Sequence, residues 1–195
     1  MTYKYDIFLS YRHAAPVGEW VSQYFYPLLK QWLPEIIPRD SKIFIDKDGI
    51  ETGSNWSARL SQALQSSRCL VAILSPSYFR SEWCLAEWHS MRERERLWNF
   101  KTVEQPGGLI YSIVFSDGKH FPPEAKATQQ KDLKKWNSSA RAFSETQAYI
   151  ELEQEVQKIS EELWLMIQSA PEWHPDFPIV QPVANPTITM KLPRF

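Results

Sequence analysis

Four short apolar runs, separated by amphipathic segments, constrain the fold of this chain more than any other feature of its sequence. Each run is five to seven residues long, rich in β-branched and aromatic side chains, and bounded by polar or turn residues. Such continuous apolar character, without strict alternation, is typical of parallel strands that are covered on both faces. We therefore predict four buried strands, at Tyr5–Tyr11, Lys42–Asp46, Cys69–Ser75 and Leu109–Phe115.

Apolar residues recur every three or four positions between these runs, which predicts amphipathic helices. The predicted helices span Val17–Leu33, Ser54–Ser67, Ser81–Trp98 and Ser144–Ser169. We expect Pro34 to end the first helix, Ser81 to cap the third and Pro171 to end the last. The run Arg92–Arg96 in the third helix is interpreted as a solvated face of mixed charge.

The alternation of strands and helices predicts right-handed βαβ units around one parallel sheet, with helices on both faces. A fifth strand is expected near Lys131–Trp136, inside the long loop Ser116–Ser144. Residues 1–170 form one predicted domain, and residues 171–195 form a Pro-rich arm. The prolines exclude a regular helix there, so the arm packs on the domain, packs on a partner, or serves as a linker.

Composition and charge narrow the possible functions. The formal net charge is −1, so no bulk affinity for nucleic acids or anionic membranes is expected. No apolar run approaches the ~20 residues that a membrane span needs, and the N-terminus does not resemble a signal peptide. The two cysteines, Cys69 and Cys84, form neither a disulfide framework nor a zinc site. We therefore expect a cytoplasmic protein without a metal ion.

Polar and aromatic residues gather where the predicted strands end. Ligands of open α/β sheets bind beyond the carboxyl ends of the strands, so these residues share one edge. They lie at 10–13, 46–50, 75–77 and 116–118. Trp83 and Glu87 are four positions apart, and therefore lie on one face of the third helix. A ring beside a carboxylate suits an aromatic base on a ribose, although from spacing alone a packing tryptophan and an exposed glutamate are the commoner outcome.

Three ordered blocks resemble Toll/interleukin-1 receptor (TIR) domains. YDIFLSYRH at 5–13 resembles the first conserved box of the family, and IFIDKDGIETGSNW at 43–56 resembles the second strand and the BB loop. LSPSYFRSEWCLAEW at 74–88 resembles the third strand and the helix after it. This last block includes the W-x-x-x-E pattern of the NAD-cleaving members, here Trp83 to Glu87. The resemblance covers about residues 3–170 and implies a flavodoxin-like α/β fold of three layers.

The resemblance also implies an activity. NAD-cleaving members break the nicotinamide–ribose bond, and the ADP-ribose is then hydrolysed, cyclised or transferred. NAD+ is the substrate, and no cofactor or metal is needed. By matched motif, Glu87 is the expected catalytic residue. The expected substrate-binding residues are Tyr11, Arg12, Trp83, Asp46, Asp48, Gly49, Ile50 and Ser75.

Partners and biological role follow from the same resemblance. We expect a homo-oligomer that forms through the BB loop and the helix at 82–98. The chain resembles bacterial stand-alone TIR proteins, such as those of Thoeris-type antiphage defence, which implies a nucleotide messenger and a separate effector or sensor protein.

Two alternatives are open to test. The first is a non-catalytic TIR scaffold that acts by homotypic assembly, although a scaffold would not need Glu87. The second is a phospho-acceptor receiver domain, which needs an acidic pair after the first strand and an aspartate after the third. This chain has Ser10-Tyr11-Arg12 and Ser75-Pro76 at those places, which argues against a receiver.

Overall fold

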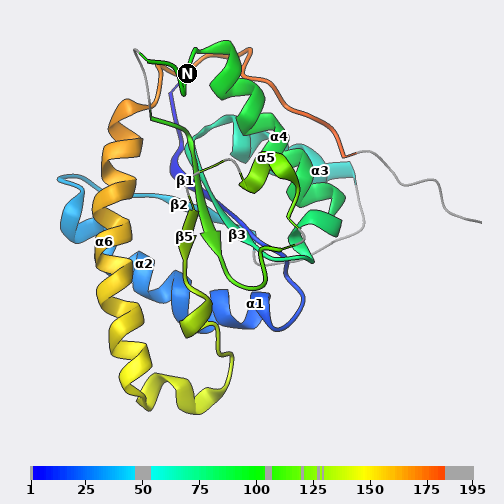
Figure 1. Cartoon of the computed structure of the whole chain (residues 1–195). Helices are drawn as coiled ribbons and strands as arrows, with labels where there is room; N and C mark the ends of the chain where they lie inside the picture. Colours follow the sequence, from blue (N-terminus) through cyan, green and yellow to red (C-terminus); the bar gives the residue numbers. More distant parts are fainter. Residues whose placement is uncertain are drawn as a thin grey trace, which may run out of the picture.

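A five-stranded parallel sheet forms the centre of the molecule (Figure 1). The computed structural model describes residues 2–46, 54–103, 107–119, 121–126, 128 and 130–182. The strand order is β2-β1-β3-β4-β5, and every neighbouring pair is parallel. The strands are β1 Tyr5–Ser10, β2 Ile43–Ile45, β3 Ser67–Leu74, β4 Ile110–Val114 and β5 Gln130–Asp132. The four apolar runs are thus confirmed as strands of one parallel sheet.

Helices cover both faces of the sheet, as the alternating sequence pattern predicts. One face carries α1 (Val17–Trp20), a π-helical segment (Val21–Phe25), α2 (Tyr26–Ile36) and α6 (Gln147–Ser169). The other face carries α3 (Ser54–Gln65), α4 (Glu82–Leu97) and α5 (Pro123–Lys126). The result is the three-layer α/β fold that was expected.

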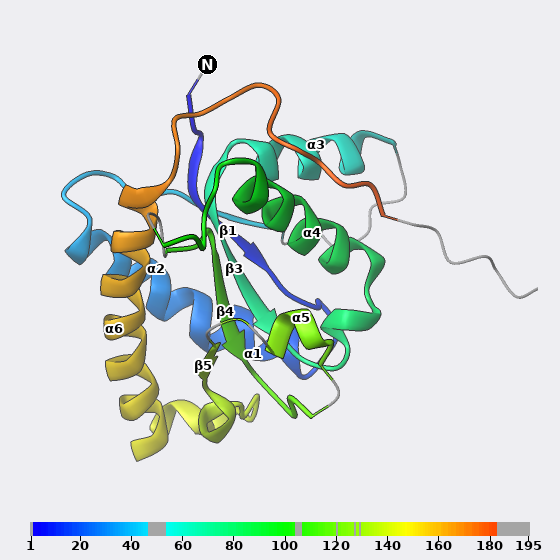
Figure 2. The same cartoon turned by 45° about the horizontal axis from the view of Figure 1, so that its top comes forward.

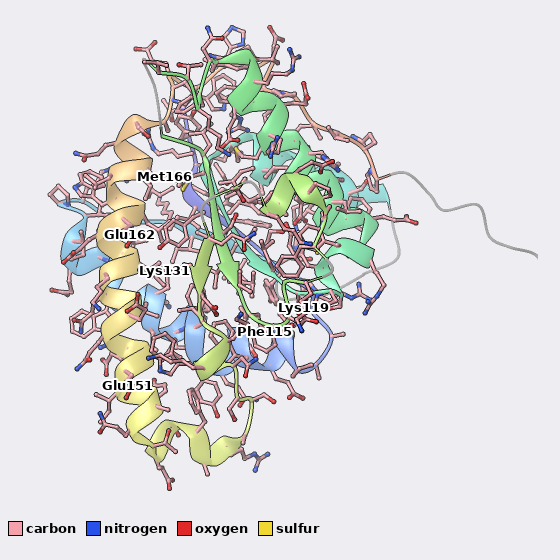
Figure 3. The ribbon with its side chains drawn as sticks, in the orientation of Figure 1. Phe115, Lys119, Lys131, Glu151, Glu162 and Met166 are labelled. Atoms are coloured by element: carbon pink, nitrogen blue, oxygen red, sulfur yellow. The ribbon has the colours of Figure 1, made fainter. Side chains whose placement is uncertain are left out.

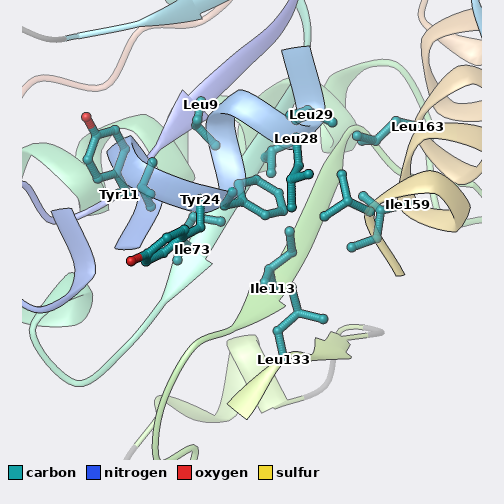
Figure 4. Packing of buried hydrophobic residues seen from close by; sticks show 14 of the residues in the cluster. Leu9, Tyr11, Tyr24, Leu28, Leu29, Ile73, Ile113, Leu133, Ile159 and Leu163 are labelled. Carbon is teal, nitrogen blue, oxygen red and sulfur yellow. The ribbon is translucent and has the colours of Figure 1, made fainter. Parts of the chain in front are cut away.

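Apolar side chains that alternate along the strands build one core on each face. Ile73 and Ile113 belong to the cluster that includes Leu28 of α2 and Ile159 of α6 (Figure 4). Leu70 points the other way and belongs to the cluster beneath α3, α4 and α5. This division follows from the pleat of a strand, in which successive side chains point to opposite faces.

Pro34 does not end the first helical body, which corrects one prediction. The helix continues to Ile36, and the N–H of Ile37 donates to the carbonyl oxygen of Leu33 at 3.0 Å. The missing N–H of Pro34 removes only the helical hydrogen bond to the carbonyl oxygen of Lys30, so the last turn can still close after it. Burial of Leu33 and Ile37 on either side favours the completed turn.

The fifth strand is shorter than predicted and begins earlier. Strand β5 ends at Asp132, and Lys134–Trp136 forms a 3₁₀ turn. Polar side chains hold this edge strand against α6, because the ammonium group of Lys131 lies 2.7 Å from Glu155 and 3.1 Å from Glu162 (Figure 3). Apolar periodicity could not show this strand, because Gln130–Asp132 contains no apolar side chain.

The interpretation of Arg92–Arg96 as a solvated face is wrong at its centre. The side chain of Arg94 is fully buried, and its guanidinium donates to the carbonyl oxygen of Ser67 at 2.7 Å. Glu95 is also buried, and its carboxylate accepts the N–H of Leu109, just before β4, at 2.7 Å. Both charges are retained inside because they satisfy backbone groups that would otherwise lack a partner.

The first part of the Pro-rich arm packs on its own domain. Residues 171–182 run in extended form from the end of α6 across α3 and α4 (Figure 2). Gln65 donates to the carbonyl oxygen of Pro175 at 2.7 Å, and the N–H of Val180 donates to Ser90 Oγ at 2.8 Å. We call residues 171–182 the strap. The division of the chain into a domain at 1–170 and an arm at 171–195 stays a prediction.

No helix in the part of the chain that the structure describes has the length and apolar character needed to cross a membrane.

Candidate functional site

A cavity of about 280 Å³ opens beyond the carboxyl ends of β1 and β2, between α3 and α4. Its lining combines apolar, aromatic and charged side chains. It is formed by Phe8, Leu9, Ser10, Tyr11, Arg12, His13, Ala14, Asp46, Leu60, Ser81, Trp83, Cys84 and Glu87. Five residues predicted for the site therefore meet in one cavity: Tyr11, Arg12, Asp46, Trp83 and Glu87.

The loop after β1 forms one wall of this cavity. Tyr11 is 8% exposed, and its hydroxyl donates to the backbone carbonyl oxygen of Asp46 at 3.2 Å. The ring of exposed His13 lies 4.8 Å from that of Tyr11, measured between centroids. Burial raises the pKa of Tyr11 to about 12, and nearby Asp46 acts in the same direction. Tyr11 thus stays neutral at physiological pH and links the ends of β1 and β2.

Asp46 follows β2 and contributes a buried carboxylate. Its Oδ1 lies 3.1 Å from Nη2 of Arg59 on α3, and the aspartate is 6% exposed. Buried charges are normally paired in this way, because an isolated carboxylate loses its hydration. The pair joins the end of β2 to α3 at the side of the cavity.

Helix α4 presents Trp83 and Glu87 to the cavity. Ser81 caps this helix as predicted, since its Oγ accepts the N–H of Cys84 at 3.4 Å. Trp83 is half-buried and Glu87 is 8% exposed, so the glutamate is not the solvated helix residue that its spacing alone favoured. Four-residue spacing places both side chains on one helix face.

The carboxylate of Glu87 is strongly perturbed. Its Oε2 accepts the hydroxyl proton of Ser10 at 2.5 Å. Burial raises the pKa of Glu87 to about 8, the hydrogen bond from Ser10 opposes this increase, and the charge of Asp46 adds to it. A buried carboxyl with a raised pKa, facing a cavity, is typical of functional sites.

Four predicted binding residues are not placed in the cavity. Ser75 is buried outside it, where its Oγ lies 2.9 Å from Ser77 Oγ and accepts the N–H of Tyr78 at 3.1 Å. Asp48, Gly49 and Ile50 lie outside the described residues.

Comparison with known protein families identifies the chain. A family model described as a TIR domain matches residues 7–146, which is more than half of the chain. The chain belongs to the TIR domain family. Residues 7–146 of this TIR domain include the five cavity residues named above. Comparison with curated protein sequences found no match.

Solved structures that are similar to this TIR domain include the following two. The TIR domain of a Toll-related receptor, TRR-2 from Hydra magnipapillata, is 14% identical, with a TM-score of 0.49 over 79% of this chain and 99% of that chain. The TIR domains of the activated Roq1 resistosome, which recognises the pathogen effector XopQ, are 19% identical, with a TM-score of 0.37 over 85% of this chain and 81% of that chain.

Two residues near Glu87 in this TIR domain were not selected from the sequence. Ser10 is the last residue of β1, and its hydroxyl contacts both Glu87 and Tyr78. Ser10 lies within the predicted edge, so its position in the chain was a usable signal. Tyr78 had no such signal, because its hydroxyl reaches Ser10 from a 3₁₀ turn that only the folded structure defines.

The cavity of the TIR domain offers a buried carboxylate for chemistry. Cys84 lines it, but burial raises the pKa of this thiol to about 12, so a reactive thiolate is not favoured. Within the described residues, no group of three or more histidine, cysteine or acidic side chains is arranged to hold a metal ion.

Proposed function

We propose that this TIR domain cleaves the bond between nicotinamide and ribose in NAD+, with Glu87 as the catalytic carboxylate. One observation carries the proposal: a buried glutamate and a tryptophan ring, one helical turn apart, face the same cavity at the carboxyl edge of the sheet. The family includes NAD-cleaving enzymes with this tryptophan–glutamate pair, and Trp83 and Glu87 have the spacing of that motif.

The chemistry of glycosidic cleavage fits one buried carboxylate. The C–N bond breaks and both of its electrons leave with nicotinamide, which discharges the pyridinium charge and needs no general acid. The ribose carbon becomes oxocarbenium-like, and the carboxylate of Glu87 stabilises that developing positive charge. Water then adds to the carbon and loses a proton to give ADP-ribose. Addition of an adenine ring nitrogen, also with loss of a proton, gives a cyclic product.

The other cavity residues match parts of the substrate. The rings of Trp83 and Tyr11 offer flat surfaces for stacking against a base. The guanidinium of Arg12 suits the anionic phosphates. Because the cavity holds about 280 Å³, it accepts the nicotinamide ribose, while the rest of the dinucleotide extends beyond it.

A signalling role forms the second part of the proposal. The product is a nucleotide messenger that acts on a separate effector in bacterial antiphage defence. The active form is a homo-oligomer joined through the helix at 82–98 and the BB loop. Support for this part comes from the resemblance to stand-alone TIR proteins of Thoeris type and is therefore an argument by analogy.

Incubation of the purified protein with NAD+ tests the proposal, with and without a crowding agent to favour assembly. We expect release of nicotinamide, measured by chromatography, and a loss of at least 100-fold in Glu87→Gln, the order expected when one electrostatic group of an active site is removed. Mass spectrometry of the second product distinguishes hydrolysis from cyclisation.

Glu161→Gln is the matched control, because Glu161 is an exposed glutamate of α6, away from the cavity and from the helix proposed for assembly. This variant should keep the wild-type rate. Absence of nicotinamide release under every assembling condition would favour the scaffold function. A Glu87→Gln variant as active as the wild type would exclude Glu87 as the catalytic group.

A further inference from the structure

We propose that Ser10 and Tyr78 form a hydroxyl chain that orients the Glu87 carboxylate and favours its ionised form, which the reaction uses. They are positioning residues, because they act on the substrate only through Glu87. The catalytic meaning of this inference rests on the proposed function, whereas the effect on Glu87 itself can be measured without any substrate.

The chain of hydroxyl groups joins three elements of the fold. Ser10 ends β1, Tyr78 begins the 3₁₀ turn after β3, and Glu87 lies in α4. Ser10 Oγ is 2.8 Å from the hydroxyl of Tyr78 and 2.5 Å from Oε2 of Glu87. All three side chains are buried, so water cannot readily replace either hydrogen bond.

The direction of donation follows from proton counting. A serine hydroxyl has one proton, so when Ser10 donates to Glu87 it must accept from Tyr78. Burial raises the pKa of Tyr78 well above its ordinary value, so the phenol keeps the proton that it donates. In the resulting chain Tyr78 donates to Ser10 and Ser10 donates to Glu87. Both hydrogen bonds therefore favour the ionised carboxylate.

Packing fixes both hydroxyl groups in place. The N–H of Tyr78 donates to Ser75 Oγ at 3.1 Å, and its ring meets those of Phe79 and Trp88 edge to face. Ser75, whose predicted contact with substrate stays a prediction, accepts this N–H and so holds the turn that presents Tyr78. Ser10 is held by pairing of β1 with β3, where it lies opposite Ala72.

The geometry leaves one carboxylate oxygen for the ligand. Oε2 of Glu87 is occupied by Ser10, and no hydrogen bond to Oε1 is found within the part of the chain that the structure describes. Since Glu87 lines the cavity, Oε1 is the atom available to the ribose. A fixed carboxylate lowers the reorganisation that the transition state would otherwise require.

Other charged and titratable groups surround Glu87. Asp46 at the end of β2 disfavours its ionised form, and Arg59 of α3 pairs with that aspartate. The loop after β1 adds Arg12, His13 and Tyr11 to the cavity, and α4 adds Cys84. Among the described residues, Ser10 is the group whose hydrogen bond lowers the pKa of Glu87, so we expect its removal to raise that pKa further.

Three variants distinguish the effect of the hydroxyl chain on Glu87 from the effect of a general change in packing. Ser10→Ala removes the direct donor, and Tyr78→Phe removes only the donor to Ser10. Ser112→Ala is the matched control, because Ser112 is a buried strand serine whose Oγ has no hydrogen-bond partner among the described residues. The titration of Glu87 is followed by ¹³C NMR of side-chain-labelled glutamate, with Glu87→Gln used to assign the signal.

We expect a midpoint near pH 8 in the wild type, an increase of about one pH unit in Ser10→Ala, a smaller increase in Tyr78→Phe and no change in Ser112→Ala. The ionised form is the active one, so kcat/KM for nicotinamide release should rise with pH through the same midpoints. At pH 7 this predicts about a tenfold loss in Ser10→Ala.

Either readout can overturn the inference. An unchanged Glu87 titration in both Ser10→Ala and Tyr78→Phe would show that the hydroxyl chain does not act on the carboxylate. If Ser10→Ala fails to fold, the Glu87 titration in Tyr78→Phe alone decides whether the hydroxyl chain acts on the carboxylate. If the NMR midpoints shift but no variant releases nicotinamide, the hydroxyl chain stands and the proposed function fails.

Discussion

At the scale of the residue, one glycine fixes the loop that carries Tyr11 and Arg12. A Cβ built on Gly18 would lie 1.9 Å from the backbone oxygen of His13, a distance at which the loop must move. We predict that Gly18→Ala lowers the free energy of unfolding by roughly 3 kcal/mol and weakens ligand binding in the cavity, because the displaced backbone also carries Tyr11. Chemical denaturation measures the first effect and calorimetry with NAD+ the second.

Gly107→Ala is the control for this prediction. Its added Cβ would be 3.9 Å from Ser169 Oγ, which is an ordinary contact. Its unfolding midpoint should stay close to that of the wild type. Equal stability of the two variants would show that the approach of Gly18 to His13 does not constrain the loop.

At the scale of the element, the two ends of α4 contact different parts of the molecule. Its first turns carry Trp83 and Glu87 to the cavity, whereas its last turn contacts Phe177 of the strap through Arg94. Phe177 is 2% exposed, its ring lies 3.9 Å from the guanidinium carbon of Arg94, and it meets Trp98 edge to face at 4.9 Å. The strap therefore stabilises the end of α4 that is remote from Glu87.

We predict that Phe177→Ala lowers the free energy of unfolding by about 3 kcal/mol, since it removes a buried ring and its contact with a buried cation. Nicotinamide release measured well below the unfolding temperature should be retained. Asp176→Ala changes an exposed neighbour on the same strap and should have little effect on stability. A Phe177→Ala variant as stable as Asp176→Ala would mean that the strap does not support the domain.

At the scale of the whole molecule, the site lowers stability at alkaline pH. The pKa of Glu87 is about 8 in the folded chain, against an ordinary value of 4.5. The folded state therefore binds the proton more tightly, so the contribution of Glu87 to stability is greatest below pH 4.5 and is lost as the pH rises through 8. A carboxylate that is ready for catalysis thus carries a cost in folding.

Glu87→Gln should remove this pH dependence. We predict that the variant is more stable than the wild type at pH 9, by on the order of 4 kcal/mol, and that the difference vanishes near pH 4.5. Denaturant unfolding at both pH values measures it. Glu93→Gln changes an exposed glutamate of α4 that pairs with Arg96, so its free energy of unfolding should differ little from that of the wild type at either pH. A Glu87→Gln variant without a gain at pH 9 would show that Glu87 is not held in a desolvating environment.

Most of the architecture was predictable because it depends on local periodicity. Strands covered on both faces must be apolar throughout, and helices on a sheet must have one apolar face. The errors at Arg94 and at β5 occurred where distant residues decide the outcome. Burial of Arg94 depends on the carbonyl oxygen of Ser67, and the length of β5 depends on its pairing with β4 and the contacts of Lys131 with α6.

The sequence by itself determined the order of strands and helices along the chain, the edge of the sheet where the cavity lies, and the motif that contains Trp83 and Glu87. Only the tertiary structure decided that Glu87 is buried and bound to Ser10, 77 positions away, and that Ser10 in turn contacts Tyr78. The physical reason is that periodicity records which face of an element avoids water, whereas hydrogen bonds between buried polar atoms depend on distances across the fold.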